Sequence, residues 1–228
     1  MKSNTQKYRP NTKALVLALI LLALLVIVEY VDEFYLGKYS EGTPFPFPSP
    51  LSEWDLSVFK LINVGLASPI LDVVLGFITH FGSTVFWLVM AILLWITGKK
   101  EDAILLSTAI IIGGAIFLPV KLIFSRARPY MVLTDIHAIA TGSGYSFPSG
   151  HSKNIFSAAV VLGDKHKKYA SLLYVLSFAV SFSRIYIGVH WPIDVVVGAA
   201  SGWLVGIIVL KYKTKIIKLA ESWLKLSL

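Results

Sequence analysis

The sequence contains no cysteine, and only 15% of its 228 residues are charged. The missing cysteines exclude disulfide bonds and thiolate chemistry, and they leave the redox compartment of the protein open. A soluble domain of this length would carry more charge, since about a quarter of the residues in such domains are charged. Acidic residues are the scarcer kind, with 13 against 21 lysines and arginines.

Long apolar stretches take the place of the missing charge, and 56% of the residues are hydrophobic. Several stretches approach the roughly 20 residues that an α-helix needs to cross a bilayer. We therefore predict an all-α integral membrane protein, in which residues 1–228 form a single six-helix transmembrane bundle. The predicted spans are 14–31, 70–97, 103–124, 149–162, 169–182 and 192–210.

The distribution of basic residues predicts the orientation of this bundle. No small-x-small cleavage site follows the first apolar stretch, which favours an uncleaved span over a signal peptide. Six spans place both termini on one side, and 14 of the 21 lysines and arginines fall on that side. Because cytoplasmic segments are enriched in these residues, we expect cytoplasmic termini in the cell membrane. The net charge of +8 reflects this bias and is not evidence for a nucleic acid partner, and the sequence shows no sign of an obligatory protein partner.

A short amphipathic helix is predicted between the first two spans. It follows a proline-rich connection, residues 32–50, that cannot continue a helix. Ser52 opens the sequence SEWD, which matches a capping box. Apolar residues then recur at helical spacing, namely Leu51, Trp54, Val58, Leu61 and Ile62. We expect this helix to lie in the membrane interface, with packing against the bundle as the alternative.

Three polar stretches occur at the ends of the later spans, and the first is KLIFSRARP at 121–129. Lys121 and Arg128 are seven residues apart, about two helical turns, so they are predicted to share a helix face. Their long side chains could then converge on one anion. Arg126 points elsewhere on the helical wheel, and we expect it to reach toward lipid headgroups.

The second stretch is YSFPSGHS at 145–152. Ser149 is predicted to be the N-cap of the following helix. Gly150 and His151 would then offer free backbone N–H groups at a helix N-terminus, which is a favourable site for an anion. Gly150 also allows an oxygen to approach the backbone closely.

The third stretch is SRIYIGVHWPID at 183–194. Pro192 suits the first position of a helix, which makes Trp191 the N-cap and leaves His190 just outside. Asp194 would lie in the first turn and accept a hydrogen bond from the imidazole of His190. The alternative is a capping aspartate beside a packed histidine.

With six spans, the three stretches meet at one membrane face. A metal site is one interpretation, because His151, His190 and Asp194 are acceptable ligands. Three neighbouring cations and a single carboxylate oppose a divalent ion, however, so we expect no metal and no cofactor. Basic residues that merely snorkel to headgroups are another interpretation. It leaves unexplained why two histidines and an aspartate occur at the same junctions.

The three stretches contain the motifs K-x6-RP at 121–129, PSGH at 148–151 and SR-x5-H-x3-D at 183–194. In order and spacing, these motifs resemble those of the type 2 phosphatidic acid phosphatase family. These are lipid phosphate phosphatases, in a superfamily that also contains vanadium haloperoxidases. The resemblance covers a motif-bearing core at about 103–210. The small size resembles that of bacterial members such as phosphatidylglycerophosphatase B and undecaprenyl-pyrophosphate phosphatase.

The resemblance implies a role for each motif residue. His190 would be the nucleophile that forms a phosphohistidine, Asp194 would orient it, and His151 would be the general acid and then the base. The remaining motif residues would bind the phosphate oxygens, namely Lys121, Arg128, Ser149, Gly150 and Arg184. The implied reaction is metal-independent hydrolysis of a membrane lipid phosphate at the outer face. Phosphatidylglycerophosphate, undecaprenyl pyrophosphate and phosphatidate all fit this chemistry.

Two other functions remain open at this stage. A lipid-phosphate transporter or flippase would use the basic cluster for binding only, but it gives no reason for the His190–Asp194 pair or for His151. A haloperoxidase would need bound vanadate, and the membrane setting disfavours it. His80, His137 and His166 lie outside the three motifs and are interpreted as structural. The small-residue spacing of Gly198, Gly202 and Gly206 predicts close helix packing.

Overall fold

The computed structural model describes residues 42–43, 45–142 and 144–224. Within these ranges the chain is helical, without strands, apart from one isolated bridge between Thr43 and Arg126. The helices are α2 Ser49–Asn63, α3 Pro69–Ile78, the 3-10 helix η2 Thr79–Gly82, α4 Thr84–Ile96, α5 Lys100–Phe124, α6 Pro129–Val132, α7 Gly150–Lys165, α8 Lys167–Tyr186, α9 Pro192–Lys211 and α10 Lys213–Leu224.

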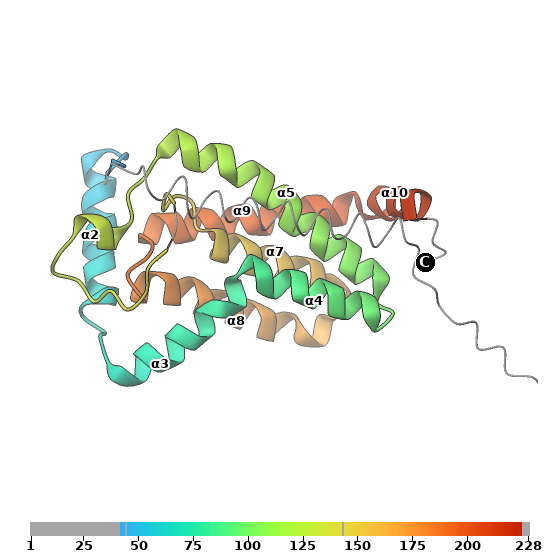
Figure 1. Ribbon diagram of the computed structural model, residues 1–228, viewed down its shortest axis with the longest axis horizontal. Helices are drawn as coiled ribbons and strands as arrows, with labels where there is room; N and C mark the ends of the chain where they lie inside the picture. Colours follow the sequence, from blue (N-terminus) through green and yellow to red (C-terminus); the bar gives the residue numbers. More distant parts are fainter. Residues whose placement is uncertain (1–41, 44, 143, 225–228) are drawn as a thin grey trace, which may run out of the picture.

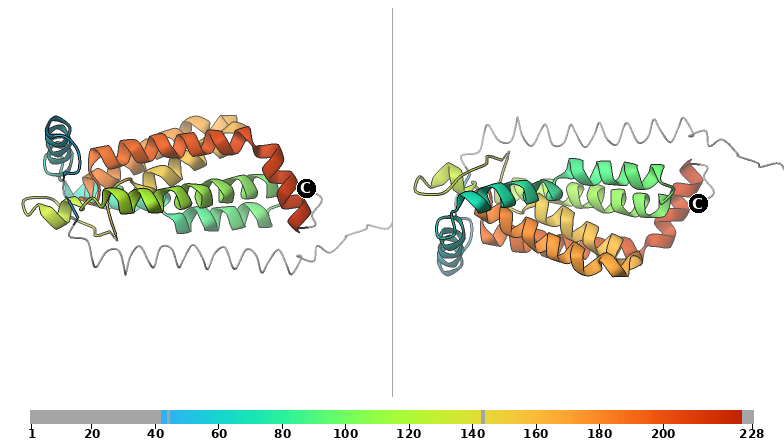
Figure 2. Two further views of the ribbon diagram at one scale, coloured as in Figure 1. Left: turned by 90° about the horizontal axis from the view of Figure 1, so that it is seen from above. Right: turned by 90° about the horizontal axis from the view of Figure 1, so that it is seen from below.

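The long helices form an elongated bundle around α7 (Figure 1). Helices α4, α5, α8 and α9 run along the long axis, α2 lies across one end, and α10 lies at the other end (Figures 1 and 2). Helix α7 packs against all four long helices. Its buried Ile155 and Ala158 meet Leu106 and Ile110 of α5 and Val180 of α8 in the largest apolar core.

Glycines of α9 bring α7 and α9 into backbone contact. A Cβ atom built on Gly198 would lie 2.5 Å from the carbonyl oxygen of Ser149, and one on Gly206 would lie 2.6 Å from the Cβ of Val160. A Cβ on Gly202 would overlap the carbonyl of Lys153. The close packing predicted from the glycine spacing is therefore confirmed, and it fixes α9 against the first three turns of α7.

Four of the predicted spans coincide with α5, α7, α8 and α9. Helices α5, α8 and α9 are long and apolar enough to cross a membrane. Helix α7 has 16 residues, a rise of about 24 Å, which is less than the roughly 30 Å of a hydrocarbon core. The predicted span 14–31 lies outside the described residues.

The predicted span 70–97 is broken near its middle. Helices α3 and η2 together meet α4 at an angle of 58°. The break follows Gly82, where Ser83 is extended and its hydroxyl accepts the backbone N–H of Phe86 at 3.0 Å. A serine N-cap starts a new helix at this point, and the bent pair places Thr79 against the bundle instead of in a straight crossing.

The predicted amphipathic helix is present as α2, and much of its polar side faces the bundle. Its buried residues are Ser52, Asp55, Phe59 and Asn63, whereas the apolar Leu51, Trp54 and Leu61 are exposed. Phe59 packs against Trp191 with ring centroids 5.2 Å apart. Packing of α2 against the bundle is therefore confirmed, whereas Leu51, Trp54 and Leu61 face outward and the location in the membrane interface stays a prediction.

The predicted capping box at Ser52 is wrong. Helix α2 begins three residues earlier, at Ser49, with Pro50 in its first turn. Proline is favoured in the first turn of a helix, because backbone N–H groups there have no partner within the helix and the lack of one costs nothing. The hydroxyl of Ser52 instead donates to the carbonyl of Phe47 at 2.9 Å.

The lysine-rich C-terminal segment contains a helix that the sequence reading missed. Helix α10 packs Ile216 and Ile217 against the buried residues of α5 and α9, while Leu219 and Trp223 are exposed. Figure 2 shows this helix bent away from the direction of α9.

The glycine contact between α7 and α9 gives a stability prediction. We expect Gly202→Ala to lower the free energy of unfolding by about 1–3 kcal/mol, because the added methyl group forces two backbones apart. Gly76→Ala on α3 is the matched control, since no heavy atom lies within 4 Å of a Cβ at that position. Thermal unfolding in detergent measures both variants. Equal melting temperatures for the two would contradict the contact.

Candidate active site

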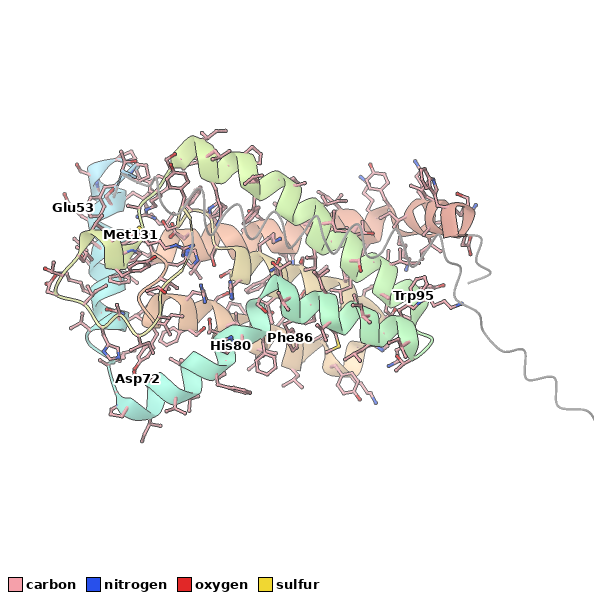
Figure 3. All side chains as sticks on the ribbon, in the orientation of Figure 1. Glu53, Asp72, His80, Phe86, Trp95 and Met131 are labelled. Atoms are coloured by element: carbon pink, nitrogen blue, oxygen red, sulfur yellow. The ribbon has the colours of Figure 1, made fainter. Side chains whose placement is uncertain are left out.

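The three polar stretches lie at the end of the bundle that α2 covers. Helices α5 and α8 end there, α7 and α9 begin there, and α6 lies in the connection between α5 and α7. In Figure 3, Glu53 and Met131 mark this end and Trp95 marks the opposite one. Helix ends from four separate segments therefore supply the polar groups of one site.

His190 and Asp194 form the predicted pair. Trp191 is the N-cap of α9 and Pro192 is its first residue, as predicted. His190 is only 2% exposed, and its Nδ1 lies 3.3 Å from Oδ2 of Asp194. The same Oδ2 accepts the backbone N–H of Trp191 at 3.0 Å. The aspartate thus caps the helix and holds the histidine at the same time.

The other ring nitrogen of His190 faces Arg128. Its Nε2 lies 3.2 Å from Nη1 of Arg128. A guanidinium can only donate hydrogen bonds, so Nε2 must be the unprotonated acceptor. The ring proton then sits on Nδ1 and points at Asp194. This arrangement leaves a lone pair on the nitrogen that faces the cations.

The charge state of His190 follows from its surroundings. Burial lowers the pKa of His190 well below its ordinary value of 6.5, and the charges of Arg128, Arg184 and Lys121 lower this pKa further. Burial disfavours the charged imidazole because the charged form loses more solvation than the neutral form. At pH 7 the imidazole is therefore uncharged and has the lone pair that a nucleophile needs.

Arg128 reaches His190 by a route that the sequence did not predict. Helix α5 ends at Phe124, and Ser125 adopts a left-handed conformation with φ of 41°. Arg128 is then the extended residue before α6, so the prediction that it shares a helix face with Lys121 is wrong. The chain turns back toward α9, where Arg128 donates to the carbonyls of Val189 at 2.9 Å and Gly144 at 3.0 Å.

Lys121 stays on the last turn of α5, and its charge acts on both His151 and His190. His151 also lies within reach of the charges of Arg184 and Arg128. The structure therefore brings together the cations and both histidines of the three predicted stretches, although Arg128 and Lys121 come from different local structures.

The start of α7 matches its prediction. Ser149 is the N-cap, and its Oγ accepts the backbone N–H of Ser152 at 3.4 Å. The backbone N–H of Ser149 donates to the carbonyl of Asp194 at 2.9 Å. No heavy atom lies within 4 Å of a Cβ built on Gly150, so there is open space beside the first turn of α7, at the kind of helix N-terminus that binds anions.

Arg184 is buried in the last turn of α8. Its Nη1 donates to Oγ1 of Thr79 at 2.8 Å. Its buried Nε has no hydrogen-bond partner among the described residues. A buried donor without a partner is costly, and a bound oxyanion would supply the missing acceptor. Thr79 was not predicted as part of the site, because only the bend between η2 and α4 brings it there.

Arg126 is the clearest error of the sequence reading. It was expected to reach lipid headgroups, but it is fully buried. Its Nη1 donates to Oδ1 of Asp194 at 2.7 Å, and its Nη2 forms an ion pair with Asp55 of α2. The helical wheel failed because α5 ends two residues before Arg126. A polar stripe on α2, made of Ser52, Asp55 and Asn63, was the available signal that this helix faces a polar partner.

The arrangement suits a tetrahedral oxyanion. It combines three cationic side chains, a helix N-terminus and a neutral imidazole at one end of the bundle. The described residues contain no group of three or more histidine, cysteine or acidic side chains that could hold a metal ion. His137 and His166 pair elsewhere, with Asp72 at 2.7 Å and Asp102 at 2.9 Å.

Comparisons with known proteins agree with this chemistry. The sequence pattern of the PAP2 superfamily matches residues 102–218. The chain is 30% identical to undecaprenyl-diphosphatase from Sulfolobus acidocaldarius over 190 residues, which cover 82% of this chain and 84% of that protein. It resembles the crystal structure of Aquifex aeolicus LpxE with a TM-score of 0.65 and 35% identity, over 69% of this chain and 94% of the other.

A second solved structure is similar over more of the chain. This is the transmembrane PAP2 type phosphatidylglycerolphosphate phosphatase from Bacillus subtilis, with a TM-score of 0.65 and 24% identity. The match covers 87% of this chain and 96% of that one. At this level of identity the likeness concerns the fold.

The close packing of the Arg128 guanidinium against Gly142 gives a testable prediction. A Cβ atom built on Gly142 would lie 2.9 Å from Cζ and Nη1 of Arg128. We expect Gly142→Ala to displace the guanidinium and weaken vanadate binding at least tenfold, since hydrogen bonds to charged groups contribute about 1.5–3 kcal/mol. Isothermal titration calorimetry with vanadate measures the change, with Gly76→Ala as control. Unchanged affinity in Gly142→Ala would show that Arg128 does not contact the anion.

Proposed function

Since the chain belongs to the PAP2 superfamily and is a membrane-associated phosphatase, we propose that it hydrolyses a lipid phosphomonoester or diphosphate through a phosphohistidine intermediate. The observation that carries this proposal is the state of His190. Its ring is neutral, held by Asp194 through Nδ1, and directed through Nε2 toward the cations.

In the first half-reaction, Nε2 of His190 attacks phosphorus as the bond to the leaving lipid oxygen breaks. Asp194 stabilises the positive charge that develops on the imidazole, as the aspartate of a serine protease does for its histidine. His151 donates a proton to the leaving oxygen. The negative charge of the bound phosphate offsets the surrounding cations, which favours the protonated ring that a general acid needs.

In the second half-reaction, water attacks the phosphohistidine. His151, now neutral, accepts a proton from this water, the N–P bond breaks, and the electron pair returns to Nε2 of His190. Inorganic phosphate leaves, and both histidines regain their starting states. Each proton taken in one half-reaction is returned in the other.

The basic groups would stabilise the transition state. In phosphoryl transfer the charge is spread over the equatorial oxygens, and a single well-placed arginine is worth about 10³–10⁵ in rate. The proposed ligands of these oxygens are the side chains of Lys121, Arg128 and Arg184, the hydroxyl of Ser149 and the backbone N–H of Gly150. We propose that they replace the divalent cation that kinases use, so that the reaction is metal-independent.

The substrate class follows from the membrane setting and from the relatives. The Sulfolobus relative is named for undecaprenyl diphosphate, and we propose this diphosphate lipid or a phosphomonoester such as phosphatidylglycerophosphate as the substrate. The site lies at the end of the bundle opposite the lysine-rich α10. Because basic segments mark the cytoplasmic side, we propose that the site faces the outside of the cell membrane.

A transporter or flippase that only binds lipid phosphates remains the competing function. It would need the cations but not a histidine whose tautomer is fixed by an aspartate. Release of inorganic phosphate separates the two functions.

The nucleophile gives the first prediction for this function. We expect His190→Ala to abolish phosphate release from undecaprenyl diphosphate while lipid binding persists, because the cations remain. His80→Ala, an exposed histidine outside the site, is the control and should keep wild-type activity. A colorimetric phosphate assay in detergent measures release. Wild-type activity should survive EDTA and fall with vanadate, and a strict requirement for Mg²⁺ would contradict the proposed mechanism.

The cations give a prediction about pH. Lys121 is one of the charges that lower the pKa of His190, so Lys121→Gln should raise that pKa. Protonated His190 cannot attack phosphorus, and the loss of kcat/KM toward acid pH should therefore begin at higher pH in the variant than in the wild type. Titration of the substrate is common to both enzymes and cancels in the comparison. Superimposable pH profiles would mean that another group sets the acidic limb.

A further inference from the structure

Two carboxylates from distant segments share one buried arginine beside the site. Asp194 lies in the first turn of α9, and Asp55 lies in the middle of α2, on a separate part of the chain. Arg126 donates Nη1 to Asp194 and Nη2 to Asp55, and all three side chains are fully buried. We refer to these three residues as the Asp55–Arg126–Asp194 bridge.

The bridge is held in place on every side. The guanidinium of Arg126 lies between the rings of Phe47 and Trp191, at 5.0 and 4.9 Å from their centroids. Cations favour the faces of aromatic rings, more so when they are desolvated. The indole N–H of Trp191 donates to the carbonyl of Ala127 at 2.9 Å. The plane of Arg126 is therefore fixed, and so are the directions of its two donor groups.

Asp55 also binds the N-terminal turn of α9, which carries Asp194. Its Oδ1 accepts the backbone N–H of Ile193 at 2.8 Å, while its Oδ2 pairs with Arg126. Asp194 accepts the backbone N–H of Trp191 in the same turn. The first turn of α9 is thus bound by one carboxylate of its own and by one from α2, and Arg126 joins the two.

The electrostatic effect on Asp194 is specific. If Arg126 paired with Asp194 alone, its positive charge would offset most of the negative charge of Asp194. Asp194 would then stabilise a positively charged His190 ring less well. Because Nη2 of Arg126 donates to Asp55, part of the positive charge of Arg126 is offset by Asp55 instead. Asp194 then keeps more of its charge for His190, while its carboxylate plane is held by Arg126.

From these contacts we infer that Asp55 and Arg126 are positioning residues for the reaction, acting on His190 through Asp194. This inference rests on the proposed function. The side-chain hydrogen bonds of these two residues join them to each other, to Asp194 and to the backbone N–H of Ile193, so their effect should fall on the chemical step and not on substrate binding. Through Asp55, the short helix α2 thereby takes part in positioning His190.

The first test uses near-isosteric substitutions. Asp55→Asn keeps an oxygen for the N–H of Ile193 but removes the charge, and we expect kcat to fall about tenfold with KM within twofold of wild type. Arg126→Gln leaves two carboxylates without their shared cation, and we expect kcat to fall on the order of 10²-fold, the loss that a small misplacement of a catalytic group produces. Arg126→Lys restores the charge with a different geometry and should recover part of this loss.

The double variant tests whether the residues act as one unit. Removing Asp55 relieves the uncompensated charge that Arg126→Gln creates, so Asp55→Asn/Arg126→Gln should have a higher kcat than Arg126→Gln alone. The matched control is Asp135→Asn, which removes the exposed 2.8 Å ion pair between Asp135 and Lys60 of α2. This control should leave kcat and KM unchanged.

All rates are measured as phosphate release per folded protein, with folding checked by size-exclusion chromatography and near-ultraviolet circular dichroism. Variants that lose thermal stability but keep wild-type kcat would reduce the bridge to a structural role and overturn the inference. A rise in KM with unchanged kcat would also overturn it. Absence of phosphate release from the wild-type enzyme across a panel of lipid phosphates would be a failure of the proposed function itself.

Discussion

The cost of holding charged groups away from water governs the whole site. A buried charge needs a partner, and the kind of partner determines how much of its field remains available. Arg126 is paired with two carboxylates, which compensate its positive charge within the protein. Among the described residues, Arg184 donates to the hydroxyl of Thr79 and keeps a buried Nε without a hydrogen-bond partner. Two arginines of similar burial are therefore suited to opposite tasks, one to hold a carboxylate and one to receive an anion.

The local features of the site were predictable from the sequence, because they depend on residues within one helical turn. The N-cap at Ser149, the proline that starts α9, and the pairing of His190 with Asp194 all follow from backbone groups that lack partners at helix ends. The helices α5, α7, α8 and α9 followed from apolar length alone. The catalytic roles assigned from the motifs remain predictions.

The errors arose where distant segments decide the structure. Arg126 was placed on a helical wheel that the chain leaves at Ser125, and its partner Asp55 lies 71 residues away. Helix α2 was expected to lie in the membrane interface or to pack against the bundle, and its apolar spacing did not show which side would face the protein. The partner of its buried Asp55 is Arg126, on a distant part of the chain, so the polar side of α2 packs inward while Leu61 and Trp54 are exposed.

The packing of α7 against α9 sets the distance between groups of the candidate site. Gly198 allows the carbonyl of Ser149 to approach α9, and the N–H of Ser149 donates to the carbonyl of Asp194 in the same region. The distance between the proposed anion site at the start of α7 and the histidine held by Asp194 is thus set by a glycine with no chemical role. A larger residue at that position would separate the two halves of the site before it exposed any apolar surface. The small residues of α9 therefore determine the geometry of the candidate site as directly as the charged residues beside them.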